Sequence, residues 1–238
     1  HLQIPQLPAQ QSFESVIETD LKIAAVNLPQ TYAGADVGRA TSGAANALLA
    51  KAYLFQSKWD SAATAAAKVV SSNVYGLMPV YTQNFSQYYK NNMESVFSVQ
   101  HLTGQNPKLG SELNQFFAPQ VDGGYFFDAP TQSFVNEFET TVGGVVDPRL
   151  AYTVARDSMP WFNGRTFDPS WSPSTGYLTR KHQQPLSEVP NKSDGNLNYM
   201  AIRYADVLLW YAEALNESNQ TASALIPLNL VRKKARES

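Results

Sequence analysis

The sequence predicts a mainly α-helical protein made of tetratricopeptide-like helix hairpins, with long irregular loops and little β-structure. Two periodic segments and a long aperiodic region between them are the basis of this prediction. Near the C-terminus, apolar residues recur at helical spacing, at Ile202, Ala205, Leu208, Leu209 and Ala212. A second periodic run follows Thr221, a residue type that caps helices. Two amphipathic helices with a short polar turn between them predict an αα-hairpin within residues 198–238.

A similar hairpin is predicted far upstream. At a constant offset of 160 residues, Leu48, Leu49, Ala52 and Ala62 match Leu208, Leu209, Ala212 and Ala222. Small residues at Ala52, Ala62 and Ala66 would let two helices approach closely, and Trp59 lies at the predicted turn. This combination is typical of tetratricopeptide-type repeats. The alternative, that any two amphipathic hairpins share such spacing, stays open at this point.

Cap residues divide the first third of the chain into three expected helices. They run from a cap at Ser12 to Pro29, from Thr41 to Phe55, and from Asp60 to about Ser72, after an extended lead-in over residues 1–11. Arg203 and Asp206, three residues apart, are expected to form an ion pair on the surface of a later helix.

The middle of the chain lacks sustained periodicity. The segment 94–102 is the best strand candidate, and Thr131 can cap a helix that ends at Gly143-Gly144. Loops of this length are usually functional or disordered, and their many aromatic residues argue against disorder. We therefore predict one domain over 1–238, with helical-repeat parts at 12–73 and 198–238. The loop-rich part at 74–197 is expected to face a ligand.

Composition excludes several classes of function. A net charge of −2 and a pI near 5.9 give no electrostatic footprint for nucleic acid. The absence of cysteine excludes disulfides and thiolate metal sites. No apolar run reaches the roughly 18 residues that span a bilayer.

The segment from Trp161 to Arg180 carries the predicted ligand-binding residues. Sugar rings stack on exposed aromatic side chains and hydrogen bond to amides, carboxylates and guanidinium groups around them. The predicted glycan-binding residues are Trp161, Asn163, Arg165, Asp168, Trp171, Tyr177 and Arg180. Alternatively, these rings pin a long loop onto the scaffold, which is the preferred interpretation for any one ring taken alone.

Other aromatic residues are predicted to be exposed or to pack, without a role in binding. In the cluster Tyr81, Phe85, Tyr88 and Tyr89, one exposed tyrosine is expected. The run Tyr125-Phe126-Phe127 is interpreted as a buried anchor in preference to a loop platform. Trp59 and Trp210 are assigned to packing.

Catalysis has little support in the sequence. Glu137 and Glu139 would point in different directions on a helix, and His101 and His182 lack metal-ligand spacing. We therefore expect no enzyme activity, no cofactor and no metal. Two carboxylates could still meet in space as in a glycosidase, so a glycoside hydrolase fragment stays as a distant alternative.

Several segments in one order carry a family resemblance. IRYADVLLWYAEALNE (202–217) is followed by LNLVRKKA (228–235), and IETDLKIAAVNLP (17–29), GRATSGAANALLAKAYLFQSKWDSAATAAAKVV (38–70), NNMESVFSVQ (91–100) and VVDPRL (145–150) precede them. Together they resemble the SusD/RagB family. The resemblance implies a non-catalytic protein that binds oligo- or polysaccharide at the bacterial cell surface and delivers it to a TonB-dependent SusC-like transporter.

The resemblance also implies a location. Family members are surface-exposed lipoproteins of the outer membrane in Bacteroidetes-type uptake systems, held by an N-terminal lipid anchor. This sequence shows neither the signal nor the anchor cysteine, and is interpreted as an internal fragment that also lacks the C-terminal part. Contact with the membrane is expected only through that anchor. The alternative function is a helical-repeat scaffold for protein–protein docking, without a sugar site.

Overall fold

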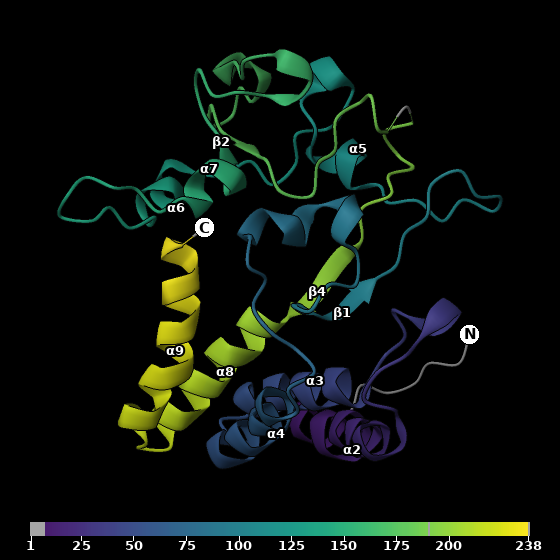
Figure 1. Cartoon of the computed structure of the whole chain (residues 1–238), viewed down its shortest axis with the longest axis vertical. Helices are drawn as coiled ribbons and strands as arrows, with labels where there is room; N and C mark the ends of the chain where they lie inside the picture. The colour runs from purple at the N-terminus through teal and green to yellow at the C-terminus, as the bar shows by residue number, and fades with distance from the viewer. Residues whose placement is uncertain (1–7, 190, 238) are drawn as a thin grey trace. The chain divides into compact units, whose positions relative to one another are not determined.

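The computed structural model describes residues 8–189 and 191–237, and helices dominate them (Figure 1). The helices are α1 (Ala9–Ser12), α2 (Glu18–Asn27), α3 (Ser42–Leu54), α4 (Trp59–Ser71), α5 (Leu113–Phe117), α6 (Gln132–Asn136), α7 (Arg149–Thr153), α8 (Tyr204–Glu217) and α9 (Thr221–Arg236). The strands are β1 (Ser95–Val99), β2 (Val154–Ala155), β3 (Leu178–Thr179) and β4 (Tyr199–Arg203). The mainly α-helical prediction is confirmed. Among the described residues, no helix is both long and apolar enough to cross a membrane.

The chain forms two compact units. Among the described residues, the helical unit contains 8–78, 91–98 and 200–233, and the loop unit contains 79–90, 99–189, 191–199 and 234–237. Both predicted helical-repeat parts fall in the helical unit, apart from residues 198–199 and 234–237. The assignment of the whole chain to one domain stays a prediction.

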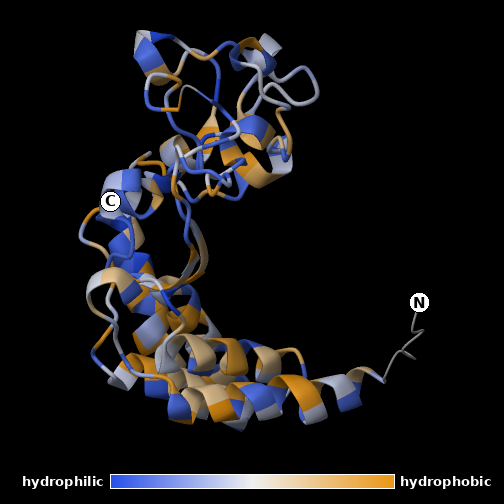
Figure 2. Ribbon diagram, turned by 90° about the vertical axis from the view of Figure 1, so that its right-hand side faces the viewer, coloured by the Kyte–Doolittle hydropathy of each residue, from blue (hydrophilic) through white to orange (hydrophobic). Residues whose placement is uncertain are grey.

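Small side chains explain how the helical unit packs. Helix α2 packs on α3, α3 packs on α4, and both α3 and α4 pack on α8. Ala52, Ala62 and Ala66 are buried, as predicted, which lets the helix backbones approach closely. Larger side chains such as Leu49 and Val69 fill the remaining space of the core. Along these helices, Figure 2 shows hydrophobic residues interspersed with hydrophilic ones.

The caps of the first helices were predicted only in part. Thr41 caps α3 as expected, because its Oγ1 accepts a hydrogen bond from the Ala44 N–H at 3.0 Å. The cap at Ser12 is wrong: the helix already begins at Ala9 and continues into α2 through a π-helical turn at Phe13–Ile17. Residues 8–11 of the expected lead-in therefore lie at or in this helix, and residues 1–7 lie outside the described part of the chain.

The predicted cap of α4 is also wrong, by two residues. Lys58 takes the N-cap position, and its side chain makes no capping hydrogen bond to the helix. Asp60 lies in the first turn of α4, where a carboxylate interacts favourably with the helix dipole.

The C-terminal hairpin forms with shifted ends. Ile202 lies in β4 instead of on the helix, because β4 pairs with β1 in a two-stranded sheet. Thr221 is the first residue of α9, and its hydroxyl donates to Asn216 Oδ1 at 3.0 Å instead of capping the helix. The ion pair of Arg203 and Asp206 forms at 3.3 Å, and Arg203 is the N-cap residue of α8. Its guanidinium also contacts the buried Glu94 at 3.3 Å.

The loop unit holds short elements. Strands β2 and β3 pair antiparallel, with Val154 opposite Thr179 and Ala155 opposite Leu178. Strand β1 lies within the predicted segment 94–102, which confirms that strand. The Thr131 cap also forms, but α6 ends at Asn136, well before the predicted glycine pair. A bridge between Thr140 and Val146 closes a turn there instead.

Candidate functional site, an exposed aromatic platform

Trp161 lies in a small core of the loop unit. It is 4% exposed and shares this core with Ala155, Phe167 and Leu178. The centre of its ring lies 5.6 Å from that of Phe167 and 6.4 Å from that of Trp171. The faces of a ring this deeply buried are not accessible to a sugar. For Trp161, packing is therefore the interpretation that fits the structure.

A carboxylate from another loop holds this core in place. Asp122 Oδ2 accepts hydrogen bonds from Trp161 Nε1 at 3.3 Å and from Arg165 Nη2 at 2.6 Å. The Arg165 guanidinium also lies 5.1 Å from the centre of the Trp171 ring. Trp161, Arg165 and Trp171 were predicted as a group and do come together. Asp122, which joins them, was not singled out because it lies about forty residues upstream.

The other four predicted residues have partners of their own. Asn163 is exposed, and its Oδ1 accepts from the Ser187 hydroxyl at 3.2 Å. Asp168 accepts the Ser170 N–H at 2.8 Å, and this hydrogen bond lowers the pKa of the carboxyl. Tyr177 donates to Gln132 Oε1 at 2.6 Å. Arg180 Nη1 donates to the Ala151 carbonyl at 2.8 Å, and burial lowers the pKa of its guanidinium. Ligand binding by the seven residues stays a prediction.

Three exposed rings lie together elsewhere in the loop unit. Phe116 is 37% exposed, Tyr125 49% and Phe127 53%. The ring centre of Phe116 lies 6.4 Å from Tyr125 and 6.1 Å from Phe127, and those of Tyr125 and Phe127 are 5.5 Å apart. The planes of Phe116 and Phe127 differ by only 12°. We call these three rings the aromatic platform. All three residues are accessible to solvent, which the buried Trp161 is not.

Backbone hydrogen bonds hold the platform in place. The Tyr125 N–H donates to the Gln115 carbonyl at 2.9 Å, and the Phe127 N–H donates to the Phe116 carbonyl at 2.8 Å. Gly124 permits this arrangement, because a Cβ there would lie 2.1 Å from the Ala118 carbonyl oxygen. Since the backbone that carries the rings is held before a ligand arrives, little backbone entropy is lost on binding.

The sequence interpretation of this segment is correct for one ring of three. Phe126, between the two exposed rings, packs against the Trp161 core and is the expected anchor. Tyr125 and Phe127 point away from that core. In the other aromatic cluster, Tyr88 is 73% exposed and Tyr89 is 45% exposed, where one exposed tyrosine was expected.

Polar groups lie beside the platform. The side-chain amide of Gln115 donates to the Gly123 carbonyl at 3.1 Å. The Lys192 ammonium lies against Gly123, so close that a Cβ on this glycine would be 2.2 Å from it. An amide and an ammonium group next to stacked rings can hydrogen bond to sugar hydroxyls. Within the described part of the chain, no group of three or more His, Cys, Asp or Glu side chains could hold a metal ion.

Comparisons by family profile, by sequence and by structure all find SusD-like proteins. The sequence profile of the SusD family matches residues 93–237. A SusD-like protein of Bacteroides ovatus is 28% identical over 94% of this chain and 44% of its own length. A SusD-like carbohydrate-binding protein from Bacteroides fragilis superposes with a TM-score of 0.82 at 24% identity, over 97% of this chain and 53% of its own.

A further solved structure contains a sugar. It is the surface glycan-binding protein A from Bacteroides thetaiotaomicron in complex with laminarihexaose, with a TM-score of 0.77 at 21% identity over 98% of this chain and 55% of its own. The chain thus spans about half the length of the relatives it matches, 44% and 46% for the two curated ones. The family profile covers more than half of this sequence and the same fold recurs in the solved structures. This chain belongs to the SusD family.

Proposed function

We propose that this chain is the part of a non-catalytic, cell-surface protein that binds an oligo- or polysaccharide and passes it to a TonB-dependent SusC-like transporter in the outer membrane. The aromatic platform carries the sugar-binding part of the proposal. Its three aromatic residues are 37–53% exposed and lie side by side, so a glycan chain can stack on them.

The chemistry of the platform favours a neutral glycan. The CH-rich face of a sugar ring replaces water on Phe116 and Phe127, while its hydroxyls meet Gln115 and Lys192 at the edge. Because the platform is open and buries little of the ligand, the affinity should fall in the micromolar to millimolar range. A chain of several sugar units would bind more tightly than one, since it can cover several rings.

Relatives support this class of ligand. The solved structure from Bacteroides thetaiotaomicron holds laminarihexaose, and another structural neighbour is described as a laminarin-binding SusD-like protein. β-Linked gluco-oligosaccharides are therefore the first ligands to test. Delivery to a transporter and location at the cell surface are supported by membership of the family.

The test is isothermal titration with laminarihexaose and with matched malto-, xylo- and manno-oligosaccharides. We expect saturable binding of one class, lost in the double variant Tyr125→Ala/Phe127→Ala. Phe134→Ala is the matched control, because Phe134 is 45% exposed in the same unit but lies in a separate ring pair with Phe138. Binding that survives the double variant would refute the role of the platform. Loss of binding in the control as well would point to misfolding, which circular dichroism detects.

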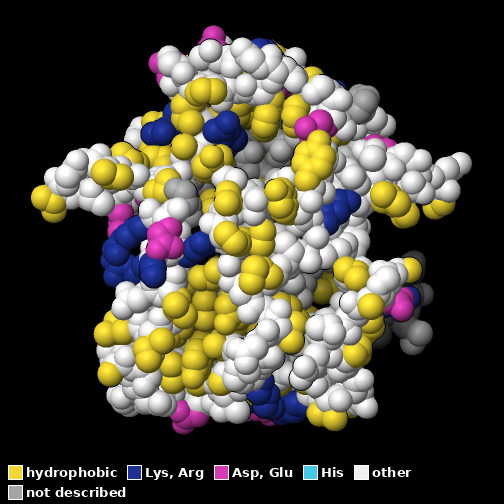
Figure 3. Space-filling view, in the orientation of Figure 1, with side chains coloured by type: hydrophobic (Ala, Val, Ile, Leu, Met, Phe, Trp, Pro, Cys, Tyr) yellow, Lys and Arg dark blue, Asp and Glu magenta, His cyan; other side chains and the backbone are white. Residues whose placement is uncertain are grey.

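One observation favours docking as a second function. Exposed apolar side chains gather where Figure 1 draws α8 and α9, as Figure 3 shows. The exposed large apolar residues of α8 and α9 are Leu209, Leu225, Ile226 and Leu230, which are 39–67% exposed. A protein partner could cover this face while the platform binds sugar. Ile226→Glu should then abolish co-purification with the transporter and leave oligosaccharide titrations unchanged.

A further inference from the structure

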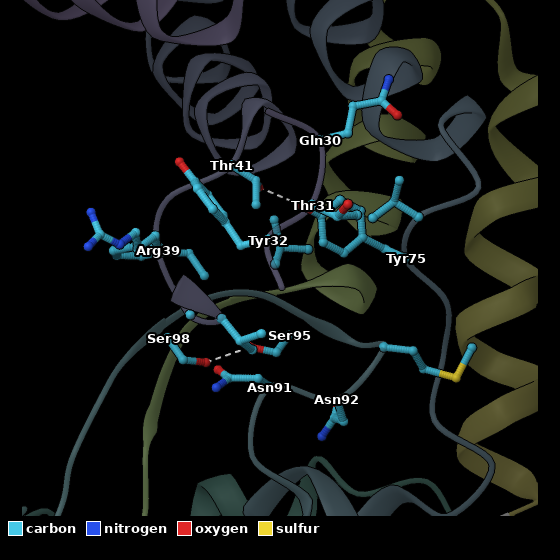
Figure 4. A pocket seen from close by; sticks show the side chains of 16 residues that line it. Gln30, Thr31, Tyr32, Arg39, Thr41, Tyr75, Asn91, Asn92, Ser95 and Ser98 are labelled. Carbon is cyan, nitrogen blue, oxygen red and sulfur yellow. Dashed lines mark hydrogen bonds between the residues drawn. The ribbon is translucent and has the colours of Figure 1, made fainter. Parts of the chain in front are cut away.

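A hollow lies wholly within the helical unit, and its lining includes no residue of the aromatic platform. Its walls come from the segment before α3, from the segment after α4, and from the turn and strand at 91–98. Figure 4 shows Thr31, Tyr32 and Arg39 on one side, and Asn91, Ser95 and Ser98 on the other. We call it the loop pocket. Its volume is about 170 Å³.

One wall of the loop pocket is fixed by a hydrogen bond between two hydroxyl groups. Thr41 Oγ1 and the Tyr75 hydroxyl lie 2.6 Å apart, and Thr41 also caps α3. The Tyr75 ring stacks on Tyr204 with a centroid distance of 6.5 Å. Gly43 makes room for this ring, since a Cβ there would lie 2.5 Å from Tyr75. The wall therefore keeps its shape without a ligand.

The opposite wall is equally well supported. The Ser95 and Ser98 hydroxyls are hydrogen bonded at 2.6 Å, and Ser98 is only 4% exposed. Asn92 Oδ1 accepts the Glu94 N–H at 2.9 Å, and the Gly76 N–H donates to the Met93 carbonyl at 2.9 Å. The Gly76 hydrogen bond ties the turn at 91–94 to the segment after α4, and the Ser95 N–H, which donates to the Asn92 carbonyl at 3.0 Å, ties it to β1.

The lining of the pocket combines polar and apolar groups in similar measure. Hydroxyl and amide side chains come from Gln30, Thr31, Tyr32, Thr41, Tyr75, Asn91, Asn92, Ser95 and Ser98. Apolar surface comes from Val37, Val74, Met93, Val96 and Phe97. The guanidinium of Arg39 is paired with Asp36 at 2.8 Å. A wall of this kind suits a ligand with many hydroxyl groups and no net charge.

The volume of the loop pocket limits the size of the ligand that can bind. Pockets for drug-sized molecules begin at roughly 300 Å³, and this pocket is smaller. We propose that the loop pocket binds one neutral sugar unit, either a free monosaccharide or the end of a glycan chain. This site goes beyond the platform: it binds a single ring in an open hollow lined by polar groups, whereas the platform binds a chain by stacking. The two sites share no residue, so each can fail without the other.

The test is a titration of the isotope-labelled protein with methyl glycosides of glucose, galactose, mannose and xylose, followed by amide NMR. We expect saturable shifts at residues 30–39 and 91–98, with a millimolar dissociation constant because so few atoms are bound. Thr31→Trp fills the pocket and should abolish these shifts. Ala35→Trp adds the same side chain to the same loop outside the lining residues, and should bind like the wild type.

The double variant Tyr125→Ala/Phe127→Ala separates this proposal from the previous one. It should keep the shifts at the loop pocket while oligosaccharide binding at the platform is lost. No saturable shift at 30–39 and 91–98 with any glycoside up to about 100 mM, well above millimolar constants, would overturn the pocket proposal. Shifts that persist unchanged in Thr31→Trp would overturn it too. Neither result bears on the platform.

Discussion

Glu18 on α2 offers a sharp test of how the helical unit is held together. This carboxylate is 4% exposed and receives hydrogen bonds from Lys22 at 2.9 Å and from Lys58 at 2.7 Å. Lys58 precedes α4, so the contact ties α2 to the neighbouring hairpin. Burial raises the pKa of Glu18, but the hydrogen bonds from Lys58 and Lys22 outweigh it and lower the pKa from 4.5 to about 2.

The lowered pKa of Glu18 gives the size of its contribution to the free energy of unfolding and the pH range in which this contribution is lost. A fall from 4.5 to about 2 corresponds, at about 1.4 kcal/mol per pKa unit, to at most about 3.4 kcal/mol. The side chains of Lys22 and Lys58 are 54% and 34% exposed, so water screens the pair. We therefore expect about 1–2 kcal/mol. Because the folded pKa lies below the unfolded one, this contribution is present above pH 4.5 and is lost as the pH falls toward 2.

Urea unfolding followed by circular dichroism at 222 nm measures this contribution, since the long helices belong mainly to the helical unit. At about pH 7, Glu18→Gln should lower the free energy of unfolding by about 1–2 kcal/mol, and near pH 2 the variant and wild type should agree. Asp20→Asn, on the exposed side of the same helix, is the control. If Glu18→Gln is as stable as wild type near pH 7, or differs from it equally near pH 2, the reasoning is refuted.

Three further predictions concern the same unit. Thr41→Ala removes the cap of α3 and should lower the stability by about 1 kcal/mol in urea unfolding, with Thr41→Ser close to wild type. Gly43→Ala should displace Tyr75, cost about 1–3 kcal/mol in the same assay, and weaken glycoside binding in the loop pocket; unaltered NMR shifts of Tyr75 would contradict this. Arg203→Met leaves Glu94 buried at 3% exposure with one ion pair fewer, and should cost about 3–5 kcal/mol in thermal unfolding, partly restored by adding Glu94→Gln.

The helical scaffold could be predicted because its signals are local. Ala62 and Ala66 repeat at helical spacing, and helical spacing alone places them on one buried face. Thr41 caps its helix through its own side chain, three residues from the group it binds. The errors arose where a distant partner decides the structure. Ile202 has a helical neighbourhood in sequence but pairs with β1 about a hundred residues away.

The candidate site was harder to predict, because exposure of an aromatic ring depends on contacts far along the chain. Trp161 was placed among the ligand-binding residues for its tryptophan ring, yet Asp122 and Phe167 fix it in a core. Tyr125 and Phe127 received the opposite assignment, although both rings are about half exposed. In both cases the sequence shows that the residues are aromatic, but it does not show whether each ring is buried or exposed.

One signal at 122–127 could have pointed to the platform. Two glycines precede three consecutive aromatic residues. The central ring of such a run can anchor the loop while its neighbours stay exposed, and here the chain bends at Phe126, whose φ is +44°. Phe126 is that anchor, and it packs against the same core that holds Trp161. The buried tryptophan and the exposed platform are therefore parts of one arrangement: the core that removes Trp161 from the surface is what presents Tyr125 and Phe127 to a ligand.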